Sequence, residues 1–396
     1  MKININLLRN KNGKLHYPSL LFALASIWPA CGFLPAMPAA LVYAIPILYA
    51  AYCLGKQKEL NPLMLILVAY IPLELLIAQP SPIFKSWPRY ILFLLLLINV
   101  SPLLDSNILR SYRKNIFKVT MYACVFLGVG SFFARFLGIN YMVIDDEFVA
   151  FGTGLFGGLT PHSMMLGPIA GVAGCYLASR AYKTKRKLDW LWVVMALGAV
   201  MFSASRSALM AAIAGIIVTV YRQSGSASKF IQIGIVAFVI AASTFSLWGS
   251  ALDNVIEKNG GAGALNIDSR EAMWEERWKD FKESPIFGVG FCAAGHMGGF
   301  GIDVKTGRIE SGSSWIIIFS MLGIVGACIV FPIFFKAFIA AYKSKTELSA
   351  VACGVLSLFF IHMFAEGYVF AGGSFLAFML WLTVGIATDC KYKKEE

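Results

Sequence analysis

The strongest constraint on this chain is a succession of long apolar runs separated by short polar connections. A hydrocarbon core of about 30 Å takes roughly 20 apolar residues per helix, and backbone groups in lipid must be satisfied internally, so helices are expected throughout. Hydrophobic residues make up 58% of the chain and charged residues 14%, a balance unlike that of soluble domains. We therefore predict an all-α, polytopic integral membrane protein with about 12 transmembrane helices in a single transmembrane domain, residues 1–396. The runs are centred near residues 26, 45, 70, 96, 127, 173, 196, 213, 240, 327, 357 and 379.

The distribution of Lys and Arg predicts which side of the membrane each connection faces. Short cytoplasmic loops of membrane proteins carry an excess of positive charge. If the N-terminus is cytoplasmic, most of the 34 basic residues fall in connections on the cytoplasmic side. Both termini are therefore predicted to be cytoplasmic, with an uncleaved first helix. The net charge of +12 then belongs to loops beside anionic headgroups and gives no indication of nucleic-acid binding.

Two connections on the predicted periplasmic side are too long for simple turns, about residues 140–162 and 250–312. The longer one contains "DSREAMWEERWKDFKESPIFGVG", which predicts a short amphipathic helix. Asp268 or Ser269 is the candidate N-cap of this helix, and Pro285 ends it.

One stripe of this predicted helix is apolar, because Trp274, Trp278 and Phe281 recur at helical spacing. Such a stripe suits the membrane surface or the side of the bundle. Trp274 is also a candidate substrate-binding residue, since its ring would stack on a sugar. Arg270 and Arg277 lie seven residues apart, so their guanidinium groups would point towards one place. Alternatively, Arg277 pairs with nearby glutamates on a solvated face.

The helix is followed by "SPIFGVGF", residues 284–291, where Gly288 and Gly290 would let the backbone approach another element or a ligand. A phosphate-binding glycine loop would need a strand before it and a helix directly after it, and neither is indicated. His296, farther along, is a candidate ligand or proton carrier, or an ordinary polar loop residue.

A lone arginine, Arg206, lies in "FSASRSALMAA" at the predicted outer end of an apolar helix, beside several serines. A charge in or near the membrane is costly by itself, so such residues are functional candidates. A short outer turn also tolerates one arginine that snorkels to the headgroups, and this alternative stays open.

Several of these features occur in a recognisable order: a Ser-Arg-Ser turn that opens an apolar helix, a long outer loop with an arginine followed by Trp and Phe, "PIFGVGF", and "SSWIIIFSMLGIVG". Their order resembles that of the Wzy-type O-antigen polymerase and O-antigen ligase superfamily, over about residues 150–330. The segment "GLTPHSMMLG", Gly158–Gly167, is similar to the short histidine-containing stretch of that family. The N-terminal third matches the family only in hydropathy.

The resemblance implies a glycosyltransferase of the bacterial inner membrane whose active site faces the periplasm. Its donor would be a glycan carried on undecaprenyl pyrophosphate. The acceptor would be a second lipid-linked repeat unit in a polymerase of O-antigen, capsule or exopolysaccharide, or lipid A core in a ligase. No cofactor, metal or nucleotide sugar is expected. The expected partners are the lipid-linked oligosaccharide and membrane lipids, with a chain-length regulator protein as a further candidate.

The chemistry of this reaction suggests roles for the arginines. Breaking a glycosyl pyrophosphate bond develops negative charge on the leaving group, and arginines bind phosphate bidentately without losing their proton. Preorganised cations stabilise such a transition state. We therefore expect Arg206 and Arg270 to act as catalytic residues that clamp the pyrophosphate, and Arg277 to assist in substrate binding.

The reaction also needs a base that takes the proton of the acceptor hydroxyl. Ligases of the superfamily carry a His-Asn pair before the helix that follows the long loop, where this chain reads "RIESGSSW". This departure weakens the ligase interpretation and nominates Glu310 as the catalytic base, with a solvated loop charge as the alternative. His162 and His296 are candidate substrate-binding residues, although His162 would also serve as a helix cap. Glu366, near another outer turn, competes with Glu310 for the role of base.

The acidic run at residues 145–147 has the composition of a divalent-cation site, but a solvated acidic loop is the simpler interpretation, and the resemblance argues against a metal. The alternative of a different class is a lipid-linked oligosaccharide flippase. Transporters of that kind usually show paired repeats and ionisable residues at mid-membrane. Here the two halves show no clear repeat and the charges cluster at the outer face, which favours the enzyme.

Overall fold

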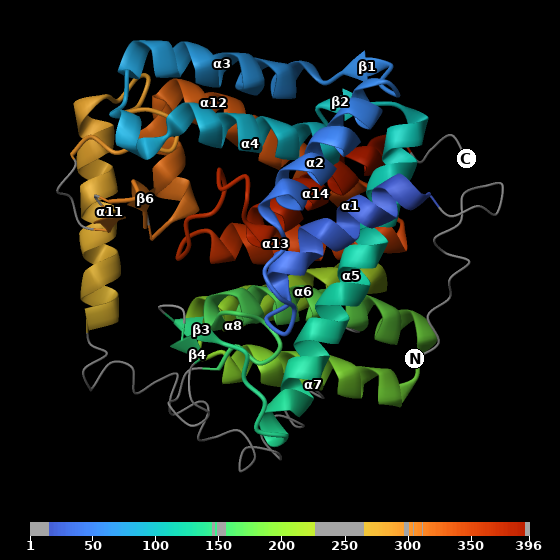
Figure 1. Ribbon diagram of the computed structural model, residues 1–396. Helices are drawn as coiled ribbons and strands as arrows, with labels where there is room; N and C mark the ends of the chain where they lie inside the picture. The colour runs from blue at the N-terminus through green and yellow to red at the C-terminus, as the bar shows by residue number, and fades with distance from the viewer. Residues whose placement is uncertain are drawn as a thin grey trace.

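The computed structural model describes residues 16–144, 147–148, 156–225, 265–296, 301–303, 305–310 and 312–392. Within these ranges the chain is mostly helical, with a few two-residue strands (Figure 1). The apolar helices are α1 (Tyr17–Ile27), α2 (Ala39–Leu54), α3 (Pro62–Ala78), α4 (Ser86–Val100), α5 (Asn107–Phe136), α6 (Ser163–Thr184), α7 (Lys187–Phe202), α8 (Arg206–Ser224), α12 (Ser314–Lys343), α13 (Glu347–His362) and α14 (Phe375–Asp389).

The remaining elements lie in the connections. They are the polar helix α11 (Leu265–Glu283), the 3-10 turns η2 (Trp28–Ala30), η3 (Pro82–Phe84) and η4 (Cys390–Tyr392), and three antiparallel strand pairs: β1 (Glu59–Leu60) with β2 (Leu104–Asp105), β3 (Val143–Ile144) with β4 (Glu147–Phe148), and β5 (Ile302–Asp303) with β6 (Arg308–Ile309).

The helices agree with the apolar runs of the sequence. Every predicted centre falls inside a helix except the one near residue 240, which lies outside the described residues. Among the described residues, 5 helices are long and apolar enough to cross a membrane: Pro82–Val100, Asn107–Phe136, Arg206–Ser224, Ser314–Lys343 and Phe375–Tyr392. The prediction of a helical membrane protein is therefore confirmed, whereas the number of about 12 spans stays a prediction.

α11 begins earlier than expected. It starts at Leu265, so Asp268 and Ser269 lie inside the helix and do not cap it. The prediction of the cap was wrong because a Ser or Asp locates a helix start only to within about a turn. The predicted end near Pro285 is confirmed, since α11 stops at Glu283.

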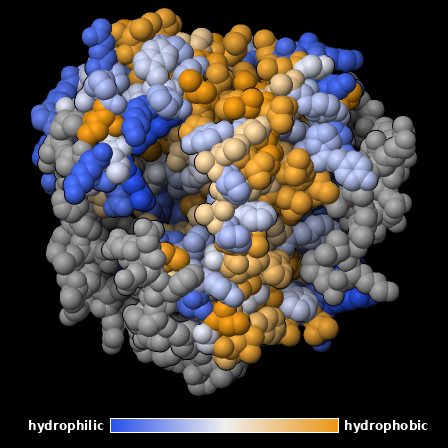
Figure 2. Space-filling model, viewed as in Figure 1, coloured by the Kyte–Doolittle hydropathy of each residue, from blue (hydrophilic) through white to orange (hydrophobic). Residues whose placement is uncertain are grey.

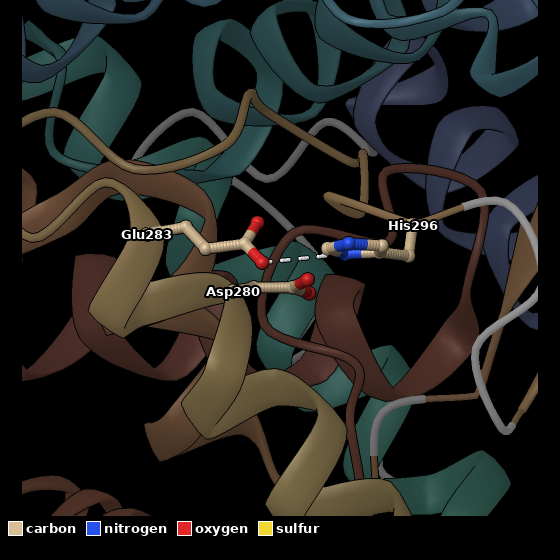
Figure 3. A group of neighbouring side chains, drawn as sticks. All are labelled: Asp280, Glu283 and His296. Carbon is tan, nitrogen blue, oxygen red and sulfur yellow. Dashed lines mark ion pairs between the residues drawn. The ribbon is translucent and has the colours of Figure 1, made fainter.

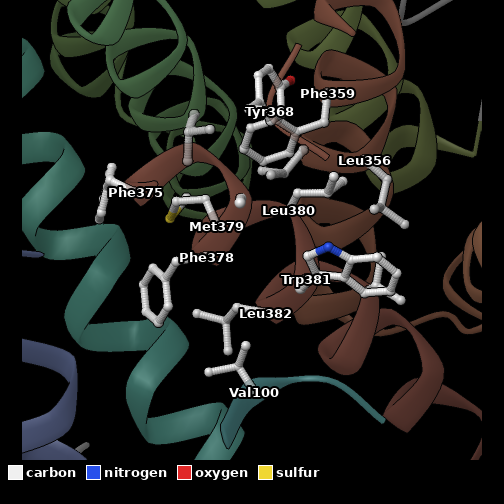
Figure 4. Close-up of a cluster of buried hydrophobic side chains, with 14 of the residues drawn as sticks. Val100, Leu356, Phe359, Tyr368, Phe375, Phe378, Met379, Leu380, Trp381 and Leu382 are labelled. Atoms are coloured by element: carbon white, nitrogen blue, oxygen red, sulfur yellow. The ribbon is translucent and has the colours of Figure 1, made fainter. Parts of the chain in front are cut away.

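The helices pack as a bundle around α14. In Figure 1, α3, α4 and α12 lie above α13 and α14, while α6, α7 and α8 lie below. Every residue of α14 from Ala377 to Ala387 is buried, and Figure 4 shows Met379, Leu380, Trp381 and Leu382 of this helix in a cluster of buried side chains. The ring centroid of Trp381 lies 5.5 Å from that of Phe93 and 5.4 Å from that of Phe334. Because α14 is surrounded by other helices, the lipid-facing surface comes from the outer helices. Figure 2 shows hydrophobic residues over α1, α2 and α5.

α6 and α8 approach each other through small residues. A Cβ on Gly167 would lie 2.6 Å from the Cβ of Ala208, and one on Gly171 would lie 2.9 Å from the Cβ of Ala212. Small side chains let membrane helices pack backbone to backbone. This packing brings the N-terminal ends of α6 and α8 side by side.

An ion cluster lies near η4, where α5 and α14 meet the β1–β2 pair. The buried guanidinium of Arg113 lies 2.7 Å from Asp389 and 3.4 Å from Asp105, and Arg110 lies 2.7 Å from Asp105. A buried cation is tolerated only where such partners compensate its desolvation. Figure 1 places β1 and β2 on the right, whereas α11 and β6 lie on the left.

α12 is interrupted at Gly323, and the segment after α11 fills the break. Gly323 has φ 63° and ψ −169°, which is not a helical conformation. Residues 285–291 run beside it and exchange backbone hydrogen bonds with both halves of the helix: Val289 N with Ser320 O (2.9 Å), Gly290 N with Met321 O (3.3 Å), Ile324 N with Pro285 O (2.9 Å) and Val325 N with Ile286 O (3.2 Å). The prediction that Gly288 allows close backbone approach is confirmed, because a Cβ there would lie 2.3 Å from Met321 O.

We predict that Gly323→Ala destabilises the protein by at least about 2 kcal/mol, because its backbone conformation is almost exclusive to glycine. The added Cβ would also lie 2.2 Å from Ile286 O. The matched control is Gly138→Ala, since Gly138 has φ +70° but no neighbouring atom within 4 Å. The temperature at which the protein in detergent loses half of its monodisperse fraction should fall strongly for Gly323→Ala and slightly for Gly138→Ala. Equal shifts in the two variants would show that the close packing of residues 285–291 against α12 at Gly323 contributes no stability of its own.

Candidate functional site

One cavity of about 1010 Å³ lies where several helices begin. Residues from the N-terminal parts of α4, α6, α8, α12 and α14 line it, and the other walls come from β6 and from residues 365–373, between α13 and α14. Figure 2 shows a hollow in this part of the molecule, beside a group of hydrophilic residues. The cavity therefore lies among the same elements as the connections that the sequence predicts to be on the outer side.

The cavity suits an anion. Helix N-termini carry a partial positive charge and unpaired N–H groups, which makes them binding sites for phosphate-like groups. Arg89, Arg206 and Arg308 line the same cavity, together with two carboxylates, Glu310 and Glu366. The positive helix ends, Arg206 and Arg308 are suited to binding an anion, and the carboxylates are candidate proton acceptors.

Arg206 is the first residue of α8 and is held by a strained turn. Ala204, two residues earlier, has φ 52°, a left-handed conformation that is uncommon for a residue with a side chain. Ser205 caps the helix by accepting a hydrogen bond from Ala208 N at 3.3 Å, and its hydroxyl lies 3.3 Å from that of Ser207. The Ser-Arg-Ser sequence thus forms the start of a helix whose positive end and arginine lie on the cavity wall.

His162 lies at the N-terminal end of α6. Its Nδ1 accepts a hydrogen bond from Met164 N at 3.1 Å, so the neutral ring carries its proton on Nε2. Burial lowers the pKa of His162 below 6.5, the cation of Arg308 lowers it further, and the carboxylate of Glu310 raises it. His162 is therefore both the helix cap that was the alternative interpretation and a neutral hydrogen-bond donor in the cavity.

The β5–β6 hairpin carries charged residues to the cavity. Ile302 and Ile309 are paired across the two strands and pack against a small cluster of Phe84, Ala293 and Ala294. Side chains alternate along an extended chain, so the residues before and after Ile309 lie on the opposite face. These residues are Arg308 and Glu310, and both line the cavity.

The structure brings together some of the predicted site residues. Arg206, His162 and Glu310 all line the cavity, although they come from distant parts of the sequence. Arg270 belongs to α11, but its side chain lies outside the part of the chain that the structure describes. Met273, in the next turn of α11, lines the cavity.

Other predicted site residues lie elsewhere. Arg277 is 1% exposed and its Nη1 lies 2.9 Å from Asp280 Oδ2, so it forms a buried ion pair. Burial lowers the pKa of Arg277 and raises that of Asp280, because both charged forms lose solvent. Trp274 donates from Nε1 to Gly312 O at 3.0 Å, and His296 lies 3.4 Å from Glu283 (Figure 3). The substrate-binding roles of these residues stay predictions.

A cluster of potential metal ligands lies at the C-terminal end of α11. Ligand atoms of Asp280, Glu283 and His296 lie within 4.8 Å of one another (Figure 3). Both oxygens of Asp280 are already engaged, one by Arg277 and the other by Gly295 N at 3.0 Å. We interpret this cluster as a contact that fastens α11 to the segment that follows it.

Sequence reasoning missed Arg89 and Arg308, and it kept Glu366 only as a competitor of Glu310 for the role of base. Arg308 is two residues before Glu310, and this period-2 spacing was the available signal for a shared face. Arg89 carried no local signal, because its position depends on contacts with residues 203 and 218 positions away.

Residues 191–331 match a family model described as O-antigen ligase. The match includes α8 with Arg206, α11, and the hairpin with Arg308 and Glu310. A search of curated proteins found no match to the chain. The family match confirms the resemblance to the O-antigen polymerase and ligase superfamily, and with the apolar helices it supports a membrane enzyme of that general type.

The pKa of His162 should respond in opposite directions to two hairpin substitutions. Arg308→Gln removes a cation and should raise the pKa, whereas Glu310→Gln removes an anion and should lower it. The pH dependence of diethyl pyrocarbonate labelling, followed by mass spectrometry of the His162 peptide, measures the neutral fraction. Lys305→Gln removes an exposed cation from the same hairpin and serves as the control. Unchanged titration in both variants would show that the hairpin does not face His162.

Proposed function

We propose that the protein is a polysaccharide polymerase that transfers a glycan from undecaprenyl pyrophosphate to a lipid-linked repeat unit on the periplasmic side of the inner membrane. The observation that carries this proposal is the cavity in which several helix N-termini and three arginines meet two carboxylates. The family match supports the same class of membrane enzyme.

The reaction exchanges one bond to the anomeric carbon for another. The acceptor hydroxyl oxygen attacks the anomeric carbon of the donor, and the bond from that carbon to the pyrophosphate oxygen breaks. Its electron pair leaves with undecaprenyl pyrophosphate, while the hydroxyl proton passes to a base. The protein must therefore stabilise a new phosphate charge and accept one proton, which are tasks for separate groups.

Arginines and helix ends stabilise the leaving group in this proposal. Arg206 acts with the positive end of α8, and Arg308 contributes from β6 on the same cavity. Arg270, which belongs to α11, is proposed to bind the same pyrophosphate. Because these charges are fixed before the reaction, they need little reorganisation as the negative charge develops.

Glu310 accepts the proton of the acceptor hydroxyl in this proposal, and His162 orients the sugar or phosphate as a neutral donor. Glu310 lies on the same cavity as Arg308, so in this proposal the acceptor hydroxyl and the leaving group are bound close to each other. Glu366, on the connection between α13 and α14, is the other carboxylate of the cavity and the alternative base.

Arg206→Gln should lower kcat by about 10²- to 10³-fold, the usual effect of removing one preorganised charge-stabilising group. Arg206→Lys should lose less, because lysine keeps the charge but not the planar fork. The measurement is the rate at which purified protein makes a ladder of products from a lipid-pyrophosphate-linked repeat unit. Arg186→Gln, at an exposed position before α7, is the matched control. Ladders at the normal rate from Arg206→Gln would refute the assignment.

A ligase that transfers glycan to lipid A core is the second candidate, favoured by the description of the matching family. Two facts favour the polymerase. The chain reads "RIESGSSW" where ligases of the superfamily carry a His-Asn pair, and among the described cavity residues the imidazole comes from His162 alone.

Deleting the gene should leave single capped repeat units on lipid A, because repeat units would still be ligated but not joined to one another. The lipopolysaccharide of the deletion strain, resolved on a gel, measures this directly. A strain complemented with the intact gene is the control. Unmodified core in the deletion strain would rule out the polymerase.

A further inference from the structure

Arg89 connects two separate segments of the long outer connection. It lies in the first turn of α4, half-buried, and its Nη2 donates to Gly307 O at 2.9 Å. Its Nη1 donates to Cys292 O at 3.3 Å. The carbonyl of Gly307 belongs to the β5–β6 hairpin, and that of Cys292 directly follows residues 285–291, which pair with α12. One guanidinium therefore fastens both segments to α4.

The hairpin lies directly on the connection between α3 and α4. Gly307 has φ +66°, and a Cβ there would lie 2.2 Å from Ile83 O. Ile302 and Ile309 pack on the small apolar cluster with Phe84, and Ile309 also packs against the main core. The hydrogen bond from Arg89 to Gly307 O adds a polar contact to these apolar ones.

The seating decides where two charged groups lie. Arg308 and Glu310 are on either side of Ile309, both line the cavity, and both influence the pKa of His162. A shift of the hairpin would move the cation and the carboxylate together. Reacting groups are sensitive to such movement, since a displacement of about 1 Å can lower a rate by about 10²-fold.

We propose that Arg89 is a positioning residue, which holds the β5–β6 hairpin so that Glu310 reaches the acceptor hydroxyl. This inference rests on the proposed function. The planar guanidinium donates to two carbonyls at once, which the single ammonium of lysine does not reproduce in the same geometry. A direct role of Arg89 as a phosphate ligand makes a different prediction, because lysine would retain the charge that the phosphate needs.

Hydrogen–deuterium exchange of the full-length protein in detergent tests the seating. Arg89→Lys and Gly307→Ala should both speed exchange in residues 301–310. The first removes the guanidinium that donates to Gly307 O, and the second places a Cβ against Ile83 O. Each has a matched control. Lys85→Gln changes an exposed cation of the same connection, and Gly138→Ala introduces a methyl group at φ +70° into open space. Both controls should exchange as the wild-type protein does.

Polymerisation kinetics test the consequence for catalysis. Arg89→Lys should lower kcat by about 10²-fold with a much smaller change in KM for the lipid-linked donor. In a protein that already carries Glu310→Gln, Arg89→Lys should cause little further loss, because the group it positions is gone. A direct phosphate ligand would instead raise KM and lose activity independently of Glu310.

The two measurements separate the failure of this inference from the failure of the proposed function. Wild-type exchange in both Arg89→Lys and Gly307→Ala would overturn the positioning role, whatever the activity. Full additivity of Arg89→Lys and Glu310→Gln would overturn it as well. If the wild-type protein makes no polymer from the lipid-linked substrate, the proposed function fails, and exchange in the hairpin still decides whether Arg89 seats it.

Discussion

The structure depends on the exchange of backbone hydrogen bonds between the broken helix α12 and residues 285–291. A helix break inside a bundle leaves carbonyl and N–H groups without their helical partners, and buried groups of this kind must be satisfied by other protein atoms. Here Met321 O and Ile324 N, on either side of Gly323, are both paired with the inserted segment. The outer connection is therefore part of the bundle, and α11 before it and the hairpin after it are held in relation to the helices.

Two of the described arginines, Arg277 and Arg206, have different surroundings. Arg277 is paired with Asp280 and buried, so its charge is compensated and fastens α11 in place. Arg206 lies at the start of α8 on a cavity wall, where the helix end adds positive charge. A cation at a positive helix end on a cavity wall suits the binding of an anion such as a diphosphate. This difference separates structural arginines from candidate functional ones.

The sequence was sufficient for features that local patterns determine and insufficient for those that tertiary contacts determine. Apolar runs located the helices, and the connections between those helices drew attention to Arg206, His162 and Glu310, which the structure brings to one cavity. The role of Arg89 was not predictable, because its partners are backbone carbonyls that carry no residue-specific signal. The break at Gly323 was equally hidden, since glycines are also common inside continuous membrane helices. Residues 285–291 were interpreted as a loop because their hydrogen-bond partners lie in α12, and a local sequence pattern does not indicate such distant partners.

A short extended segment is well suited to the site because of its periodicity. In a helix, residues two apart point in nearly opposite directions, whereas on a strand they share a face. Arg308 belongs to β6 and Glu310 directly follows it, so this short segment brings a cation and a carboxylate to the same cavity, while Ile309 between them packs against the cluster with Phe84. In the proposed reaction the cation would stabilise the leaving phosphate and the carboxylate would accept a proton, and the positions of both depend on the same hairpin. A rigid position of the hairpin would therefore fix the places of both side chains at the same time.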